Sequence, residues 1–228
     1  MSERPQRRRR LDKESRQAEI LDIAAEVFSE KGYQLTSTAE IAERAGIVEG
    51  TIYRHFASKR ELLNKVVTRA YEEAIADFED HLAGIHGTWN RLRYLIWRHL
   101  KTIHDDPALA RLVQYEVKTD PDYRETVVFE LNRSYTRCTT RIIEDAIAAG
   151  EFHADIPVSI ARDMVYGGID HQTWSYLRGE KDIDVDRIAD HIATLVYRGL
   201  ARGPAPAADD TLARIDERLA RIETLLEH

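Results

Sequence analysis

The stretch GIVEGTIYRHFASKREL, residues 46–62, decides how the first part of the chain folds. Gly50 lies inside a segment with helical periodicity, although a glycine in a helix interior costs about 1 kcal/mol relative to alanine. Ile52 and Phe56 are four residues apart, which predicts a short helix over residues 49–55 with these two side chains facing a small core. Gly50 then faces outward, where the missing side chain lets the helix come close to a partner.

The residues around this short helix complete a helix-turn-helix. Ser37 and Glu40 have the spacing of a capping box, which predicts the start of a preceding helix that ends at Gly46. Two short helices joined by a tight turn form a helix-turn-helix, whose second helix enters the major groove of DNA in many proteins. Ser58 and Glu61 form a second capping box, so we expect a long helix to begin there and to extend into the rest of the chain.

The remaining segments also have helical periodicity, and strand-like alternation is absent, so we expect an all-α protein. Besides the helix-turn-helix, helices are expected over residues 12–30, 58–82, 89–104, 107–117, 121–149, 157–177, 185–200 and 212–226. The last of these follows a linker rich in alanine and proline and has heptad-like spacing from Leu212 to Leu226. Two arrangements stay open for it: pairing with its twin in a dimer, or packing on its own body.

The formal net charge of −7 is distributed unevenly along the 228 residues. Residues 1–70 carry 14 Lys and Arg against 11 Asp and Glu, whereas the remainder carries 19 against 29. A basic N-terminal part on an acidic body predicts that only the N-terminal part binds a polyanion. One cysteine, Cys138, permits no internal disulfide and favours a cytoplasmic location, and no apolar run approaches the roughly 20 residues that span a bilayer, so we expect no membrane contact.

Motifs for catalysis or metal binding do not appear in the sequence. The nine histidines show no HExxH or clustered Cys/His spacing, and no nucleophile elbow or phosphate-binding glycine loop is present. Cys138 lies in the middle of an expected helix without a nearby base. We therefore expect no enzyme, no metal and no cofactor.

The segment ILDIAAEVFSEKGYQLTSTAEIAERAGIVEGTIYRHFASKRELL, residues 20–63, resembles the DNA-binding head of the TetR family of bacterial transcriptional repressors. The residues that carry the resemblance are Phe28, Gly32, Tyr33, Thr36, Thr38, Ile41, Ala42, Ala45, Gly46, Gly50, Tyr53, His55, Phe56 and Lys59. It covers about residues 16–75, and the body matches in its helical layout. The chain then divides into a basic disordered arm (1–15), the head (16–75), an effector-binding and dimerisation body (76–203), and a linker with an extra C-terminal helix (204–228).

This resemblance implies a palindromic operator as partner and assigns DNA contacts within the head. Residues expected to bind phosphates are Thr38, Tyr53, His55 and Lys59, and residues expected at or near base edges are Val48, Glu49, Gly50, Thr51 and Arg54. Glu49 departs from the family, in which a basic residue is common; we interpret it as a helix-end residue rather than a base reader. The arginines of the arm, Arg7, Arg8, Arg9 and Arg10, are expected to add affinity by following the DNA backbone or entering the minor groove.

Two helices of the body carry apolar stripes, which predict a homodimer through a four-helix bundle, as the resemblance also implies. The stripe residues are Ile160, Met164, Gly167, His171, Ile188, Ile192, Leu195 and Gly199.

The body most resembles TetR-type regulators of fatty-acid metabolism that sense acyl-CoA. Such an effector needs apolar residues for the acyl chain and cations for the nucleotide phosphates. The candidates are Trp97, Tyr115, Phe129 and Trp174 for the first, and Arg98, Lys101, Arg133, Arg137 and Arg141 for the second. The arginines equally fit a simple role in neutralising the acidic body. A small aromatic effector, or control by a protein partner without any small-molecule effector, are the alternatives.

Overall fold

The computed structural model describes residues 3–203, with side chains from residue 13 onward except those of residues 79 and 80. In this part of the chain every regular element is helical, and an isolated bridge between Phe152 and Ala201 is the nearest approach to a strand. The all-α prediction is therefore confirmed. The elements are α1 (Glu3–Leu35), α2 (Thr38–Arg44), α3 (Glu49–His55), α4 (Lys59–Leu82), α5 (Thr88–Asp105), α6 (Pro107–Arg111), the π-helical η1 (Leu112–Val117), the 3-10 turn η2 (Tyr123–Glu125), α7 (Val127–Ala148), α8 (Val158–Leu177) and α9 (Val185–Leu200).

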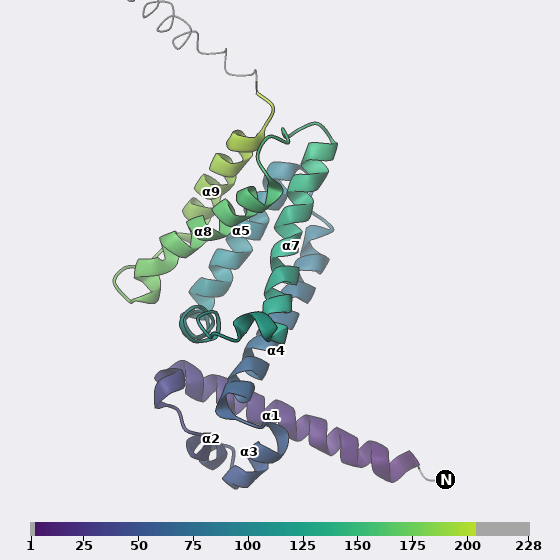
Figure 1. Cartoon of the computed structure of the whole chain (residues 1–228), viewed down its shortest axis with the longest axis vertical. Helices are drawn as coiled ribbons and strands as arrows, with labels where there is room; N and C mark the ends of the chain where they lie inside the picture. The colour runs from purple at the N-terminus through teal and green to yellow at the C-terminus, as the bar shows by residue number, and fades with distance from the viewer. Residues whose placement is uncertain (1–2, 204–228) are drawn as a thin grey trace, which may run out of the picture.

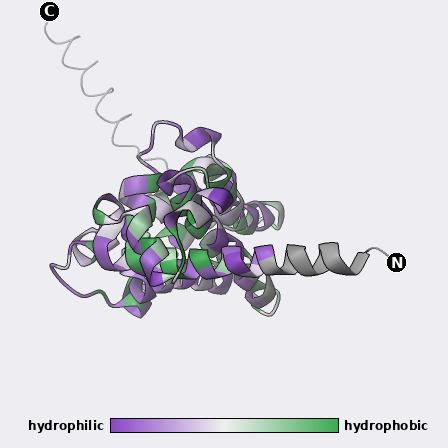
Figure 2. Ribbon diagram, turned by 90° about the horizontal axis from the view of Figure 1, so that it is seen from below, coloured by the Kyte–Doolittle hydropathy of each residue, from purple (hydrophilic) through white to green (hydrophobic). Residues whose placement is uncertain are grey.

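Helices α1 to α3 form the head, and α4 runs from the head into the body built by α5 to α9 (Figure 1). The two capping boxes form as expected, because Ser37 accepts a hydrogen bond from the Glu40 N–H and Ser58 accepts one from the Glu61 N–H. The turn between α2 and α3 passes through Gly46 with a φ of 63°, a left-handed conformation that suits glycine. Viewed from below, apolar residues gather where the helices pack (Figure 2).

Helix α1 differs from its expected form at its start. It begins at Glu3 and not near Asp12, so the segment assigned to a disordered arm continues the helix. Arginine and glutamate are good helix formers, and Pro5 is tolerated because it lies in the first turn, where no intrahelical donor is needed. At the other end Gly32 has a φ of 76°, which interrupts the helix at the expected place.

The body differs from expectation around residues 107–126. The helix expected over residues 107–117 changes at Leu112 from an α-helix to a π-helix. Helix α7 begins at Val127 and not at Pro121, because Thr126 caps it by accepting a hydrogen bond from the Phe129 N–H. The expected C-terminal helix over residues 212–226 lies outside the described residues.

Candidate DNA-binding face and effector cavity

The outward face of α3 has the open surface that contact with DNA needs. Val48 and Tyr53 are 73% and 50% exposed, while Ile52 and Phe56 are buried in the head. A Cβ at Gly50 would meet no atom within 4 Å, so the glycine relieves no crowding within the chain. Clearance for a close approach to DNA stays the prediction for Gly50.

Three predicted contact residues bind one another across the two helices. The Thr38 hydroxyl donates to the Glu49 carboxylate at 2.6 Å and lies 3.0 Å from the Tyr53 hydroxyl. Glu49 is in the first turn of α3, where a carboxylate is favoured by the helix dipole. The carboxylate thus helps to fix the start of α3, in keeping with its interpretation as a helix-end residue, and Tyr53 is held at the edge of the exposed face.

The last turn of α3 carries Arg54 and His55. Arg54 donates to the Thr51 hydroxyl at 2.8 Å, so both side chains lie together on the exposed side. Burial, together with nearby Lys13, Arg54 and Arg16, holds the pKa of His55 below its ordinary value. His55 is therefore a neutral, half-buried ring, and Lys13 and Arg16 of α1 extend the positive charge beside α3.

Lys59 has a second task that the sequence did not show. Its ammonium donates to the backbone carbonyls of Tyr33 at 2.9 Å and of Thr36 at 2.8 Å, and it lies 4.3 Å from the centre of the Tyr33 ring. These bonds tie the start of α4 to the end of α1. An ammonium has three N–H donors, so one is left for a phosphate. The side chains of Arg7 to Arg10 are outside the described part of the structure.

A cavity of about 300 Å³ lies in the body beside the head. Helices α4, α5, α7 and α8 and the α6–η1 segment line it, mostly with apolar and aromatic side chains. Among the lining residues are Val67, Ala70, Ala74, Ile103, Leu109, Val113 and Leu177. A concave, largely apolar site with a few polar groups is the usual form of a small-molecule pocket.

The cavity contains two of the predicted effector residues. Tyr115 and Trp174 both line it, with their rings 6.3 Å apart in an edge-to-face contact. Both are also partly open to solvent, at 39% and 52% exposed, so they mark its outer side. Trp97 instead packs against the core between α5, α8 and α9, and Phe129 packs against Tyr123.

The predicted phosphate-binding cations do not line the cavity. Arg98 pairs with Asp77, Lys101 pairs with Asp105, and Arg133 pairs with Glu130. Arg133, Arg137 and Arg141 are four apart and lie on the exposed side of α7, because Tyr135, Thr139 and Ile142 occupy its buried side. None of the five cations lines the cavity, and their binding of effector phosphates stays a prediction.

Polar residues that the sequence analysis did not select as effector contacts line the cavity instead. They are His99, Thr102, Asp106, Gln114, Lys118, Asp170, His171 and Thr173, with the tyrosines Tyr71 and Tyr135. One signal was available for His99: it lies in the otherwise apolar stripe of α5 formed by Leu92, Leu95, Ile96, Leu100 and Ile103. A polar residue in such a stripe faces either a partner or a cavity.

The wall of the cavity is shared with the head. Leu112 and Val117 of η1 belong to the same buried cluster as Phe28 of α1 and Leu63 of α4, and their neighbours Val113 and Gln114 line the cavity. Hydrogen bonds and an ion pair reinforce this contact between η1 and the head. A ligand in the cavity therefore touches the segment on which the head rests.

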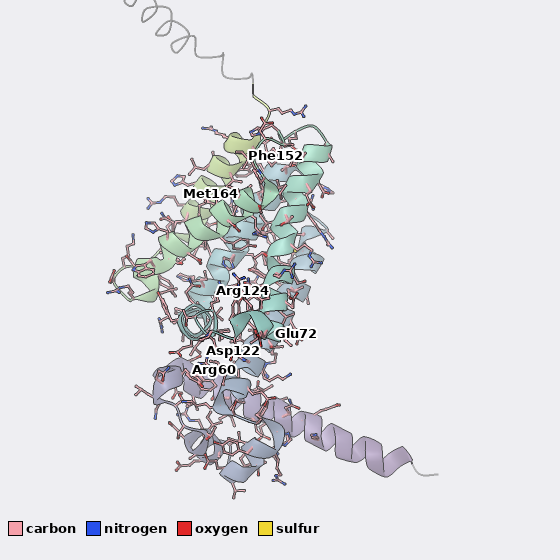
Figure 3. All side chains as sticks on the ribbon, in the orientation of Figure 1. Arg60, Glu72, Asp122, Arg124, Phe152 and Met164 are labelled. Atoms are coloured by element: carbon pink, nitrogen blue, oxygen red, sulfur yellow. The ribbon has the colours of Figure 1, made fainter. Side chains whose placement is uncertain are left out.

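We call the contact region between head and body the joint. Its contacts centre on Arg60, which lies where the head and the body meet (Figure 3). Its guanidinium donates to the Glu116 carbonyl at 3.0 Å, pairs with Asp120 at 3.2 Å and stacks 4.4 Å above the Tyr33 ring. Gln34 at the end of α1 donates to the Glu116 carboxylate at 3.0 Å. The joint thus connects α1, α4 and η1.

The stripe expected to form the dimer interface is exposed along α8 and α9. Ile160, Met164 and Leu195 are 48%, 63% and 73% exposed, and Gly167 and Gly199 have open space around them. Ile188 and Ile192 differ, since both are half-buried against the core of their own chain. His171 is exposed and also lines the cavity.

No group of three or more His, Cys, Asp or Glu side chains among the described residues is placed to hold a metal ion. No described helix is long and apolar enough to cross a membrane.

Together, an exposed recognition helix and a ligand-sized cavity beside its support define a helix-turn-helix regulator. Residues 20–66 match the family described as bacterial regulatory proteins, tetR family, and residues 68–199 match the family described as YsiA-like protein, C-terminal region. The chain therefore belongs to the TetR family of transcriptional regulators, whose members bind DNA and act as dimers, and it is not an enzyme.

Individual relatives include a regulator of fatty acid metabolism and a transcriptional repressor. The fatty acid metabolism regulator protein of Bacillus subtilis is 25% identical over 182 residues, which is 80% of this chain and 94% of that protein. The transcriptional repressor KstR2 of Rhodococcus jostii is 27% identical over 194 residues, or 83% of this chain and 93% of that one. The structure of FadR from Bacillus subtilis in complex with stearoyl-CoA superposes with a TM-score of 0.72 at 25% identity, covering 80% of this chain and 98% of that one.

Proposed function

We propose that this protein is a homodimeric cytoplasmic repressor, which binds a palindromic operator through α3 and is released by a long-chain acyl-CoA. The single observation that carries the ligand-response part is the apolar cavity, because its α6–η1 wall also packs against the head. The similar FadR was crystallised with stearoyl-CoA, which supports an acyl chain as the occupant.

The DNA contacts follow from the exposed face of α3. Val48, Gly50, Thr51 and Arg54 would meet base edges, and Tyr53 would bind a phosphate from the edge of the face. Thr38 and Glu49 act mainly by positioning Tyr53 and the start of α3, since they bind each other. Arg54 is the residue best suited to read a base, because guanidinium binds guanine O6 and N7 with two hydrogen bonds.

Release requires that the ligand prefer a head position that does not fit the operator, because a ligand with equal affinity for both states shifts nothing. An acyl chain entering between α4 and η1 would push these walls apart. The joint at Arg60 would then carry the displacement to α1 and α3 of the head.

The test is operator release measured by fluorescence anisotropy, with a duplex selected by the protein from a random pool. Palmitoyl-CoA, palmitate and benzoate are titrated against the complex. We expect release at the lowest concentration by palmitoyl-CoA. Release by benzoate alone would assign a small aromatic effector, and no release by any of the three would leave control by a protein partner.

A further inference from the structure

The cavity contains charged groups that have no partner of opposite charge among the described residues. Lys118 lines it, and its ammonium makes one long hydrogen bond, to the Gln114 amide oxygen at 3.3 Å. Asp170 lines it from α8, and its carboxylate has neither an ion pair nor a hydrogen bond with any described residue. Both residues are half-buried, so each keeps an accessible polar end that a bound ligand can reach.

His99 adds an uncharged donor to this set. Burial and the nearby Lys118 lower its pKa to about 3, so the imidazole is neutral at physiological pH. Its Nδ1 lies 2.8 Å from the Tyr135 hydroxyl, which has no other hydrogen-bond partner among the described residues. We assign the ring proton to Nε2, so that the Tyr135 hydroxyl donates to Nδ1; the described residues then offer no acceptor for the Nε2 N–H.

We propose that Lys118, His99 and Asp170 form a polar pole in the cavity that binds the thioester junction of the effector. Lys118 and His99 donate to the thioester carbonyl oxygen. Asp170 accepts from the first amide N–H of the thiol arm. This assignment rests on the proposed acyl-CoA response and specifies which part of the ligand the cavity recognises.

The charge of the pole selects the thioester over a free fatty acid. One cation, one anion and a neutral imidazole sum to no net charge, so the pole does not favour an anionic headgroup. A fatty-acid carboxylate would gain from Lys118 and would be repelled by Asp170, whereas a neutral thioester has no such conflict.

Substitutions at the pole test this selection. Binding of palmitoyl-CoA and palmitate is measured by quenching of tryptophan fluorescence, since Trp174 lines the cavity. Lys118→Met should weaken palmitoyl-CoA binding roughly tenfold. Asp170→Asn should strengthen palmitate binding several-fold, because the repulsion disappears, and should weaken palmitoyl-CoA binding less.

Matched controls remove the same charges outside the cavity. Lys65→Met changes an exposed lysine of α4, and Asp155→Asn changes a highly exposed aspartate between α7 and α8. Both should bind the two ligands as the unsubstituted protein does. If Lys118→Met and Asp170→Asn also bind both ligands as the unsubstituted protein does, while palmitoyl-CoA still releases the operator, the proposed thioester site is wrong and the proposed function stands. If palmitoyl-CoA neither binds nor releases the unsubstituted protein, both are wrong.

Discussion

Lys59 stabilises the head by joining the end of α1 to the start of α4. Its two acceptors are backbone carbonyls, that of Tyr33 directly after the Gly32 kink and that of Thr36 directly after the end of α1. A charged donor to such groups contributes about 1.5–3 kcal/mol, more than a typical neutral hydrogen bond. The residue thus has a structural task in addition to its proposed phosphate contact.

Lys59→Met should therefore lower the free energy of unfolding by about 1–3 kcal/mol, which thermal denaturation followed by circular dichroism measures. Lys31→Met is the control, because Lys31 pairs with Glu40 on the surface and should cost less than about 1 kcal/mol. Equal melting temperatures for the two variants would contradict the structural task of Lys59.

His99 gives the stability of the body an acid dependence. Its folded pKa of about 3 lies below the ordinary value of 6.5, so between these values the unfolded chain binds a proton that the folded chain does not. The stability from this residue is complete above pH 6.5 and falls as the pH decreases towards 3, by at most about 1.4 kcal/mol per unit.

Between pH 7 and pH 5 the unsubstituted protein should lose about 2 kcal/mol more stability than His99→Gln, measured by urea denaturation at each pH. His191→Gln, at an exposed position of α9, should keep the full acid dependence. A His99→Gln protein with unchanged acid dependence would show that another group causes it.

At the scale of elements, local signals predicted several helix boundaries that a cap or a glycine fixes, but not the start of α7 after Thr126. Ser37, Ser58, Gly46 and Gly32 act through neighbours within four residues, so their effect can be read from the chain. The cavity could be predicted only in part. Lys118 and Asp170 approach it from segments 52 residues apart, and no local pattern records that these two segments meet at one cavity.

The joint between head and body connects the cavity wall formed by η1 to the helices of the head. Arg60 binds the carbonyl of Glu116, and η1 is a π-helix, a form frequent at functional sites. A π-helix has wider and weaker hydrogen bonding than an α-helix, so its displacement by a ligand is less costly. Arg60 would transmit that displacement to α1 through Tyr33.

Arg60→Met should reduce this transmission. We expect several-fold more palmitoyl-CoA to be needed for half-release of the operator, with palmitoyl-CoA affinity in the absence of DNA nearly unchanged. Arg69→Met is the control, because Arg69 ties α4 to Asp22 of α1 within the head and does not contact η1. If Arg60→Met and Arg69→Met change the palmitoyl-CoA concentration for half-release equally, Arg60 acts on the stability of the head alone.

For the whole molecule, an exposed apolar stripe on α8 and α9 is the surface best suited to a second copy of the chain. Leu195 and Met164 protrude, while Gly167 and Gly199 leave space for close approach of helices. Two such pairs would form a four-helix bundle that places the two heads about 35 Å apart, one turn of DNA. Ile192 is a poor probe of this interface, because it also packs within its own chain.

Leu195→Glu should therefore produce a folded monomer. The side chain is largely exposed in the single chain, so helical content should not change, whereas the dimer would have to bury an unpaired carboxylate. Sedimentation velocity measures the mass, and Val127→Glu, at an exposed apolar residue of α7 outside the stripe, should remain a dimer. A dimeric Leu195→Glu protein would place the interface elsewhere. The monomer keeps its recognition helix, so its affinity should fall on a duplex with two half-sites and remain unchanged on a duplex with one.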